Sequence, residues 1–402
     1  MEKITVIGVG PGRQSCMTIE AAQAIEGAET VFAAARHAHL AGEKHASLEP
    51  LNAAMEDIHK RRMNGERVSV LLSGDASLYS MLPMLVRRFG ADNLRVLPGV
   101  GALQALCAAL CEPWQDAAIL SAHGRPLSTA ALAHAVRTHE RVFLFCDASH
   151  GPDWACDALS RCGLGTVEAA VGERLSSPEE RIIIGLADEL RGKSFAPLSI
   201  VRFLNPAPLK ALPPIGIADD AFERGKTPMT KREVRALAVS ALRLCKDAVI
   251  WDIGAGTGSV SIECALQCPL GQVFSIERDT DALALIQRNA EKFFTENLTA
   301  VHGKAPEALD GLPTPTHVFL GGSGGELDTI LDFLERAGTP FRLVATAVTL
   351  ENAHSMIGRL LRWKGLEAAQ VAVSRLEPVG GYHMFRAQNP VFILSADWEG
   401  KQ

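Results

Sequence analysis

The chain has 402 residues, of which 47% are hydrophobic, and its formal net charge at pH 7 is −6. This length and apolar content suit two or three α/β domains with sizeable cores, and the acidic balance excludes a global basic field for nucleic acid. The sequence shows no signal-peptide pattern, no apolar run of about 20 residues and no CxxC pair among its nine cysteines. We therefore expect a cytoplasmic protein without a membrane span or a metal site.

The chain opens with a short apolar strand that runs into a glycine-rich turn, ITVIGVGPG over residues 4–12. A strand, a turn in which glycine lets a ligand approach the backbone, and then a helix is the local architecture of a nucleotide site. A dinucleotide fingerprint would need glycine where Arg13 stands, and Pro11 removes an N–H that a phosphate would use. The turn therefore predicts a ligand site but not a phosphate cradle.

The rest of the first half carries strand-like runs on both sides of a break at 112–116. RVSVLLSG and LRVLPG precede the break, and AAILSA, RVFLFC and APLSIVRFL follow it. The segment 205–214 then contains four prolines in ten residues, which can continue neither a helix nor a central strand. We predict a first unit over 1–204 with two lobes, a linker over 205–214 and a second unit over 215–402.

The second half alternates strand-like and helix-like runs, which predicts a doubly wound, mainly parallel α/β sheet of about seven strands. The strand-like runs lie at 248–253, 272–277, 298–302, 316–320, 341–348, 367–376 and 390–396. The helix-like runs lie at 230–245, 259–268, 279–295, 325–337 and 351–363, with Thr230 as the expected N-cap of the first. Ligands of such sheets bind beyond the carboxyl ends of the strands.

A second glycine-rich turn, VIWDIGAGTGS over 249–259, follows the first strand of this half. A dinucleotide fingerprint beginning at Gly254 would need glycine where Ser259 stands. The next strand ends in Glu277, about 20 positions after the turn, where its carboxylate can accept hydrogen bonds from two ribose hydroxyls. The turn and the acid together resemble the S-adenosylmethionine site of the class I methyltransferases. By this resemblance the cofactor is bound by Thr230, Asp252, Gly254, Ala255, Gly256, Thr257, Gly258, Glu277 and Ala305.

Three further segments of the second half, PMTKREVR (228–235), HGKAPEAL (302–309) and FLGGSGG (319–325), narrow this resemblance. They are similar to the cobalamin-biosynthetic methyltransferases that act on a precorrin at carbon 15 and decarboxylate the ring C acetate. That family most often has aspartate where this chain has Lys304. The Asn/Asp-Pro-Pro-aromatic loop of many nitrogen methyltransferases is absent, so a carbon acceptor is favoured.

The first half carries LSGDASLY (72–79), LPGVGA (97–102) and SAHGR (121–125) in this order. They resemble the tetrapyrrole methylases, a two-lobed α/β family that binds S-adenosylmethionine between its lobes, in the branch that acts at carbon 5 of a precorrin. Alanine replaces the family's usual proline at Ala76. The resemblance assigns the cofactor to Gly74, Asp75, Leu78, Gly101 and Ala102, and the macrocycle to Gly10, Pro11 and Gly12.

Both resemblances together imply one enzyme with two S-adenosylmethionine sites that methylates carbons 5 and 15 of a precorrin and removes the acetate carboxyl on carbon 12. The macrocycle supplies the carbon nucleophile, so the protein chiefly has to align it with the methyl donor. Precorrins carry several carboxylates, for which the candidate binding residues are His123, Lys231, Arg232 and Arg235. Homo-oligomers are typical of both families and are expected here. The residue that handles the proton in decarboxylation has no candidate.

Two alternatives remain open at the level of sequence. Relatives of the tetrapyrrole methylases modify ribosomal RNA or a translation factor, which would require a basic face and salt-sensitive binding. A non-catalytic sensor of S-adenosylmethionine would bind the cofactor without methyl transfer. Calorimetry together with a turnover assay distinguishes these two alternatives from the precorrin methyltransferase.

Overall fold

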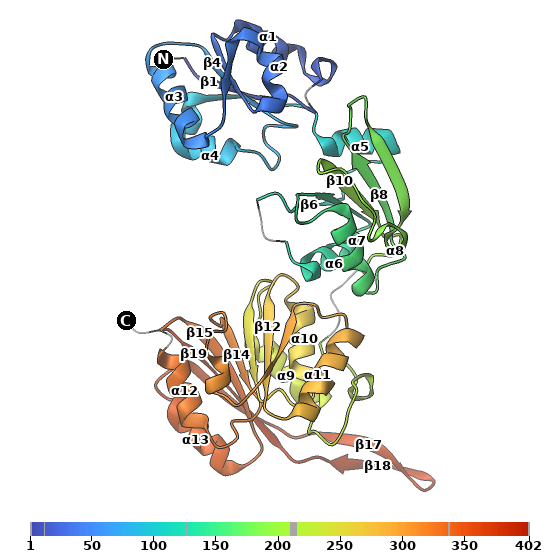
Figure 1. Ribbon diagram of the computed structural model, residues 1–402. Helices are drawn as coiled ribbons and strands as arrows, with labels where there is room; N and C mark the ends of the chain where they lie inside the picture. The colour runs from blue at the N-terminus through green and yellow to red at the C-terminus, as the bar shows by residue number, and fades with distance from the viewer. Residues whose placement is uncertain (1, 12, 125–126, 210–214, 337, 401–402) are drawn as a thin grey trace. The chain divides into compact units, whose positions relative to one another are not determined.

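The computed structural model describes residues 2–11, 13–124, 127–209, 215–336 and 338–400 of an α/β protein (Figure 1). The chain divides into two compact units, the first built mainly from residues up to Pro208 and the second mainly from Leu209 onward. Residues 210–214 of the expected linker lie outside the described ranges. Among the described residues, no helix is long and apolar enough to cross a membrane.

The first unit begins with a fully parallel sheet of five strands in the order β3-β2-β4-β1-β5. Alternation along the strands places Val6 and Val70 on the face covered by α3 and α4, and Ile7 and Leu71 on the face covered by α1. The elements are β1 Ile4–Gly8, α1 Ile19–Gly27, β2 Thr30–Ala33, α2 Ala38–Ala41, β3 His45–Ser47, α3 Leu51–Met63, β4 Val68–Leu72, α4 Leu82–Phe89 and β5 Leu94–Leu97.

The first unit continues with a mixed sheet of five strands in the order β6-β7-β10-β8-β9, in which only the β6–β7 pair is parallel. The buried Arg202 of β10 bridges Glu112 and Glu168 at 2.8 Å each, so its charge is neutralised inside the sheet layer. The elements are α5 Ala102–Leu110, β6 Ala118–Ser121, α6 Thr129–Thr138, β7 Arg141–Phe145, α7 Pro152–Arg161, β8 Glu168–Glu173, β9 Arg181–Leu186, α8 Ala187–Leu190 and β10 Ser199–Leu204.

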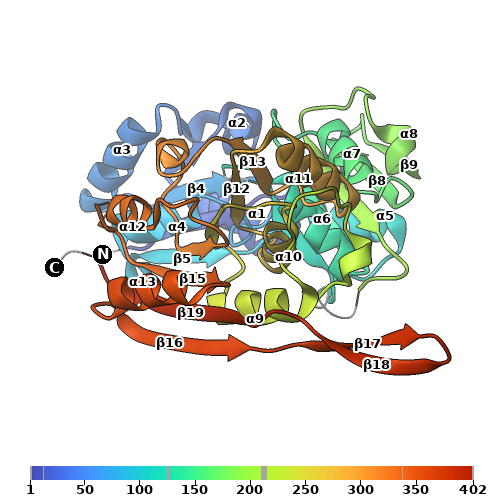
Figure 2. The same cartoon turned by 90° about the horizontal axis from the view of Figure 1, so that it is seen from below.

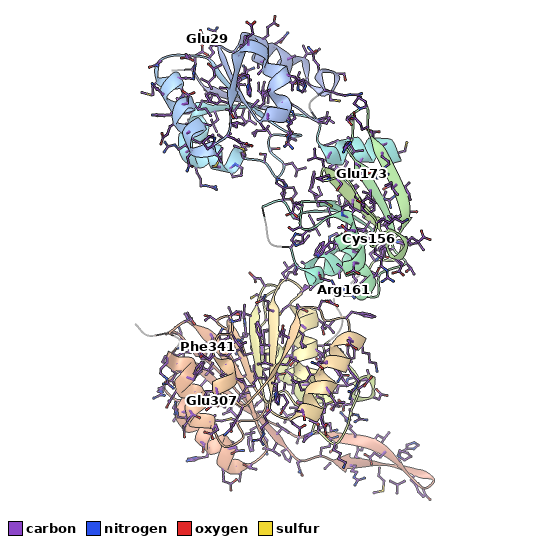
Figure 3. The ribbon with its side chains drawn as sticks, viewed as in Figure 1. Glu29, Cys156, Arg161, Glu173, Glu307 and Phe341 are labelled. Carbon is purple, nitrogen blue, oxygen red and sulfur yellow. The ribbon has the colours of Figure 1, made fainter. Side chains whose placement is uncertain are left out.

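The second unit is built on a seven-stranded sheet in the order β13-β12-β11-β14-β15-β19-β16. The first five strands of this order are parallel, and β19 runs antiparallel to both β15 and β16. Helices α9 and α10 cover one face, and α12 and α13 cover the other. Phe341 at the start of β15 (Figure 3) packs edge-to-face on Trp363, with ring centroids 5.4 Å apart.

The bounds of these elements agree with the expected alternation to within a few residues. They are α9 Arg232–Leu242, β11 Val249–Ile253, α10 Ser259–Gln267, β12 Gln272–Glu277, α11 Thr280–Lys292, β13 Leu298–His302, β14 His317–Leu320, α12 Leu327–Arg336, β15 Phe341–Ala347, α13 Leu350–Leu360, β16 Lys364–Val371 and β19 Val391–Trp398. The N-cap of α9 is Lys231 and not Thr230. A carboxylate from an earlier segment of the chain takes the role of the expected cap, because Asp219 Oδ1 accepts a hydrogen bond from Arg232 N at 2.9 Å.

The single strand expected over 367–376 is wrong, because β16 ends at Val371 and the chain leaves the main sheet. It forms a separate antiparallel hairpin of β17 Ser374–Val379 and β18 Tyr382–Ala387, which projects from the body of the second unit (Figures 1 and 2). The side chains of Tyr382 and Phe385 on this hairpin are 80% and 74% exposed. The alternating pattern continues across Val373, so the sequence does not reveal the break.

Candidate functional site

A cavity of about 1360 Å³ lies at the carboxyl ends of β11, β12 and β14 in the second unit, and we call it the C-terminal cavity. The strand order places these ends side by side, as the doubly wound pattern predicts. Residues expected to bind the cofactor line it together: Thr230, Gly254, Ala255, Gly256, Glu277 and Ala305.

The glycine turn of this cavity has a backbone that side chains would not tolerate. Gly254 and Gly256 have φ values of 73° and 58°, in the left-handed region. A Cβ on Gly254 would lie 2.6 Å from the carbonyl oxygen of Gly322, so two loops of the cavity wall meet backbone to backbone. The turn therefore presents main-chain atoms to a ligand, which fits the methionine and ribose parts of S-adenosylmethionine.

The carboxylate of Glu277 is held against this turn by the backbone. Oε2 accepts a hydrogen bond from Gly256 N at 2.8 Å, and Oε1 accepts from Arg278 N at 2.8 Å and Asp279 N at 3.0 Å. A carboxylate has about four acceptor positions, so about one remains for a ligand hydroxyl. A second ribose hydroxyl would have to replace one of the backbone donors.

Asp252, Thr257 and Gly258 do not line the C-terminal cavity. Asp252 is 1% exposed; its Oδ2 accepts a hydrogen bond from Ser261 Oγ, and its Oδ1 has no partner among the described residues. Burial raises the pKa of Asp252 to about 7, and the hydrogen bonds from Ser261 oppose this shift. The burial of Asp252 and its hydrogen bond from Ser261 give it a place in the support of the turn.

The basic residues near the turn separate into different environments. Lys231 lines the C-terminal cavity, whereas Arg232 is exposed outside it. Arg235 is 0% exposed, and its guanidinium pairs with Glu263 at 2.6 Å and Asp219 at 3.2 Å. Arg235 is thus a buried structural charge and is not available to a substrate carboxylate, contrary to the sequence-based expectation.

Other basic side chains line the same cavity and had no substrate-binding role assigned from the sequence: Arg224, Lys226, Arg278, Arg288 and Lys304. Lys304 pairs with Glu326 at 2.7 Å, and Arg288 pairs with Glu223 at 2.8 Å. Arg278 follows β12 directly and Lys304 follows β13 after one residue, at the sheet edge where ligands bind. That position was the available signal.

A cavity of about 470 Å³ in the first unit, which we call the N-terminal cavity, is lined by residues from both of its sheets. It brings together nearly all residues that the sequence assigned to this unit: Gly10, Pro11, Gly74, Asp75, Leu78, Gly101, Ala102 and His123. Gly12 lies outside the described residues.

Three loops meet at the floor of the N-terminal cavity through their backbones. Gly10 and Gly74 form a two-bonded bridge, with N···O distances of 3.1 and 2.7 Å. A Cβ on Gly99 would lie 2.4 Å from the carbonyl oxygen of Gly8. Asp75 ties two of the loops together, because its Oδ1 accepts from Ser77 N at 2.7 Å and its Oδ2 from Gly99 N at 3.0 Å.

The ionised form of Asp75 is favoured by these contacts. Partial burial opposes its ionisation, but the hydrogen bonds from Ser77, Gly99 and Leu78 outweigh burial and lower its pKa. The carboxylate is therefore charged and already bound to the protein. Sequence reasoning missed Arg36, His37, Ser73 and Arg174, which line the same cavity.

Comparison with known families agrees with this arrangement. Residues 3–191 match the tetrapyrrole (corrin/porphyrin) methylases, and residues 220–397 match a precorrin methyltransferase domain. The protein is therefore a methyltransferase in which two methyltransferase domains are fused, each with a cavity at its sheet ends. Enzymes of these families use S-adenosylmethionine as the methyl donor.

Similar proteins define the family more closely. A precorrin-6Y C(5,15)-methyltransferase (decarboxylating) of Sinorhizobium sp is 34% identical over 96% of this chain and 94% of its own length. A cobalt-precorrin-6B C(15)-methyltransferase (decarboxylating) of Salmonella typhi is 42% identical over 45% of this chain and 95% of its own. A crystal structure of a precorrin-6Y C5,15-methyltransferase from Geobacter metallireducens GS-15 shares 42% identity, covers 46% of this chain and 97% of its own, and has a TM-score of 0.44. The chain belongs to the family of precorrin-6Y C(5,15)-methyltransferases (decarboxylating).

Proposed function

We propose that this enzyme methylates precorrin-6Y or 6B at carbons 5 and 15 and decarboxylates the acetate side chain on carbon 12, giving precorrin-8 in cobalamin biosynthesis. The relative from Sinorhizobium sp, which is similar along nearly the whole chain, carries both methylations in its name. The observation that supports two reactions is the presence of a separate cavity with cofactor-type loops in each unit.

The first unit acts at carbon 5 and the second at carbon 15, with the decarboxylation. A precorrin methyltransferase domain matches residues 220–397, and the C(15)-methyltransferase of Salmonella typhi has a length that corresponds to one unit of this chain. In fold terms the first unit, 1–204, is a two-lobed tetrapyrrole methylase. The second, 215–402, is a class I, Rossmann-like methyltransferase, and 205–214 is the linker.

Each unit binds one molecule of S-adenosylmethionine, whose sulfonium methyl group is the group transferred. In the second unit Gly254, Gly256 and Glu277 hold it, with Ala305 at the adenine end. In the first unit the loops at 74–78 and 101–102 hold it, and Gly10 and Pro11 face the macrocycle. These residues bind and orient the two reactants and exclude water, which is the main task when the substrate supplies its own nucleophile.

The macrocycle is the expected small-molecule partner, and no nucleic-acid partner is proposed because the net charge is −6. Lys231 and His123 remain the candidates to contact its carboxylates, as both line a cavity. We also propose a homo-oligomer. The exposed apolar side chains of the β17–β18 hairpin support it, because water disfavours such a surface on an isolated chain.

The test is incubation of the full chain with the precorrin and S-adenosylmethionine labelled with ¹³C in the methyl group. Two added methyl groups and the loss of one carbon dioxide, seen by mass spectrometry, support the proposal. Glu277→Gln should remove methylation at carbon 15 and Asp75→Asn methylation at carbon 5, as resolved by ¹³C NMR. The reverse pattern contradicts the assignment of the units, and cofactor binding without any methyl transfer supports a sensor.

A further inference from the structure

Three polar side chains meet at the rim of the N-terminal cavity because of the strand order of the first sheet. Strands β2 and β4 are neighbours, so the residues that follow their carboxyl ends come together. Arg36 and His37 follow β2, and Ser73 follows β4 directly. Arg36 Nη2 lies 2.7 Å and His37 Nε2 lies 2.6 Å from Ser73 Oγ. All three residues line the cavity.

The buried position of His37 decides the direction of these hydrogen bonds. His37 is 3% exposed, and its Nδ1 has no partner in the described part of the chain. Burial, together with the nearby Arg36 and His39, lowers the pKa of His37 to about 4, so the ring is neutral at pH 7. A proton on Nδ1 would be a buried donor without an acceptor, which is costly. The single ring proton is therefore on Nε2 and is donated to Ser73.

Ser73 Oγ then has both of its acceptor positions occupied. A hydroxyl oxygen accepts two hydrogen bonds and donates one, and here Arg36 and His37 are both donors to it. The hydroxyl proton of Ser73 has to point away from both of them. Because Ser73 is exposed on the cavity wall, this proton is available to a ligand acceptor.

The charges around this donor favour an anionic acceptor. Arg36 and Arg174 line the cavity from its two sheets, and both side chains are exposed there. Of the acidic residues in the lining, Asp75 keeps its negative charge but accepts hydrogen bonds from Ser77 and Gly99, and it forms no ion pair with Arg36 in the described part of the chain. Glu179 accepts a hydrogen bond from Ser177 Oγ at 3.0 Å.

We propose that Arg36 and Ser73 bind a ligand carboxylate in the N-terminal cavity, and that His37 is a positioning residue that fixes the direction of the Ser73 hydroxyl. This inference rests on the proposed carbon 5 methylation by the first unit. Both the macrocycle and the amino-acid end of S-adenosylmethionine carry carboxylates. The chemistry of recognition is the same for the two sources, and the experiment has to separate them.

The first arm measures KM for the precorrin at carbons 5 and 15 in the full chain. If the carboxylate is that of the macrocycle, Ser73→Ala should raise KM for methylation at carbon 5 about tenfold, the effect of losing one hydrogen bond to a charged group. Methylation at carbon 15 in the same sample should be unchanged, and Ser73→Thr, which keeps the hydroxyl, should restore KM. Arg36→Gln should behave as Ser73→Ala does, whereas Arg67→Gln, an exposed arginine of the same unit that does not line the cavity, is the matched control.

The second arm measures the Kd of S-adenosylmethionine and of 5′-methylthioadenosine, which lacks the carboxylate. If Ser73→Ala weakens only S-adenosylmethionine binding, the carboxylate is that of the cofactor. If it raises only KM for the precorrin, the carboxylate is that of the macrocycle. Unchanged values in both arms, or equal weakening of the two nucleosides, overturn the inference. Wild-type protein that adds no methyl at carbon 5 refutes the proposed function instead, and the second arm still tests the site.

A double-mutant cycle tests the role of His37. His37→Phe should raise the same constant as Ser73→Ala, to a smaller extent. In the Ser73→Ala background it should add nothing further, because His37 acts through the hydroxyl. Additive effects would show that His37 contributes only to the stability of the loop, and would overturn this part of the inference.

Discussion

At the scale of single residues, Lys231 and Arg232 form a natural pair for testing substrate binding in the second unit. They are neighbours in sequence, but only Lys231 lines the C-terminal cavity. Lys231→Gln should raise KM for the precorrin in carbon 15 methylation about threefold to tenfold, with a smaller change in kcat, because it removes a charge that binds substrate and transition state alike. Steady-state kinetics of both variants checks this. A larger effect of Arg232→Gln would contradict the preference for Lys231.

Asp252 makes the stability of the second unit depend on pH. Its folded pKa of about 7 lies above the ordinary value of 3.8, so between these values the folded protein binds a proton that the unfolded chain has released. Stability contributed by the protonated form is therefore lost as pH rises through this window. The Tm of wild type should therefore fall relative to the Tm of Asp252→Asn by several degrees between pH 5 and pH 8. This change corresponds to about 2 kcal/mol in the free energy of unfolding. An equal difference at both pH values would contradict the raised pKa.

Residues that act through backbone geometry could be predicted from sequence, whereas residues that act through long-range partners could not. The glycines of both turns and Glu277 have fixed spacings within one strand-turn-helix unit. Arg235 illustrates the opposite case, because its partners Asp219 and Glu263 lie on other elements. Arg235 lies four positions before Val239, on the same buried face of α9, and this spacing was the sequence feature that indicated its burial. Arg36 and His37 lie in no segment that the sequence singled out, and Ser73 lies in LSGDASLY without an assigned role; the β2–β4 pairing brings the three together.

At the scale of elements, two of the strands that escaped sequence-based prediction, β2 and β8, are short or poor in large apolar residues. β2 has four residues, and β8 reads EAAVGE, in which small residues replace the usual β-branched ones. β9 is an edge strand with an exposed Ile184. The regular βα alternation of the second unit was predictable because apolar strands recur at regular spacing and α11, α12 and α13 each show an apolar face. The β17–β18 hairpin was not, because its pairing makes no use of a buried face.

The hairpin is the element that we expect to mediate self-association. The side chains of Tyr382, Met384 and Phe385 are all more than half exposed. Phe385→Glu should lower the molar mass measured by light scattering from a multiple of 43.0 kDa toward the monomer. Leu361→Glu, at a 70% exposed site after α13, is the control for an apolar side chain elsewhere on the same unit. An unchanged mass in Phe385→Glu would remove the hairpin from the interface.

At the scale of the whole molecule, two units with separate cores should unfold separately. Calorimetry should show two transitions, because a chain of this kind does not obey two-state behaviour. Saturation with S-adenosylhomocysteine should raise both transitions by about 5 to 10 °C if each unit binds one molecule. Glu277→Gln should abolish the shift of one transition only. A single ligand-sensitive transition in the wild type would contradict two sites per chain.

The position of β19 also sets the order in which the protein can mature on the ribosome. Strand β19 lies between β15 and β16, so β16 joins the sheet only by pairing with β19. Both sheets of the first unit are complete once residue 204 has been synthesised. The seven-stranded sheet of the second unit is complete only after residues 391–398 have been synthesised. During that interval β15 exposes an unpaired edge to the cell. A nascent chain stalled before residue 391 should thus carry a folded first unit and a second unit vulnerable to proteases and aggregation.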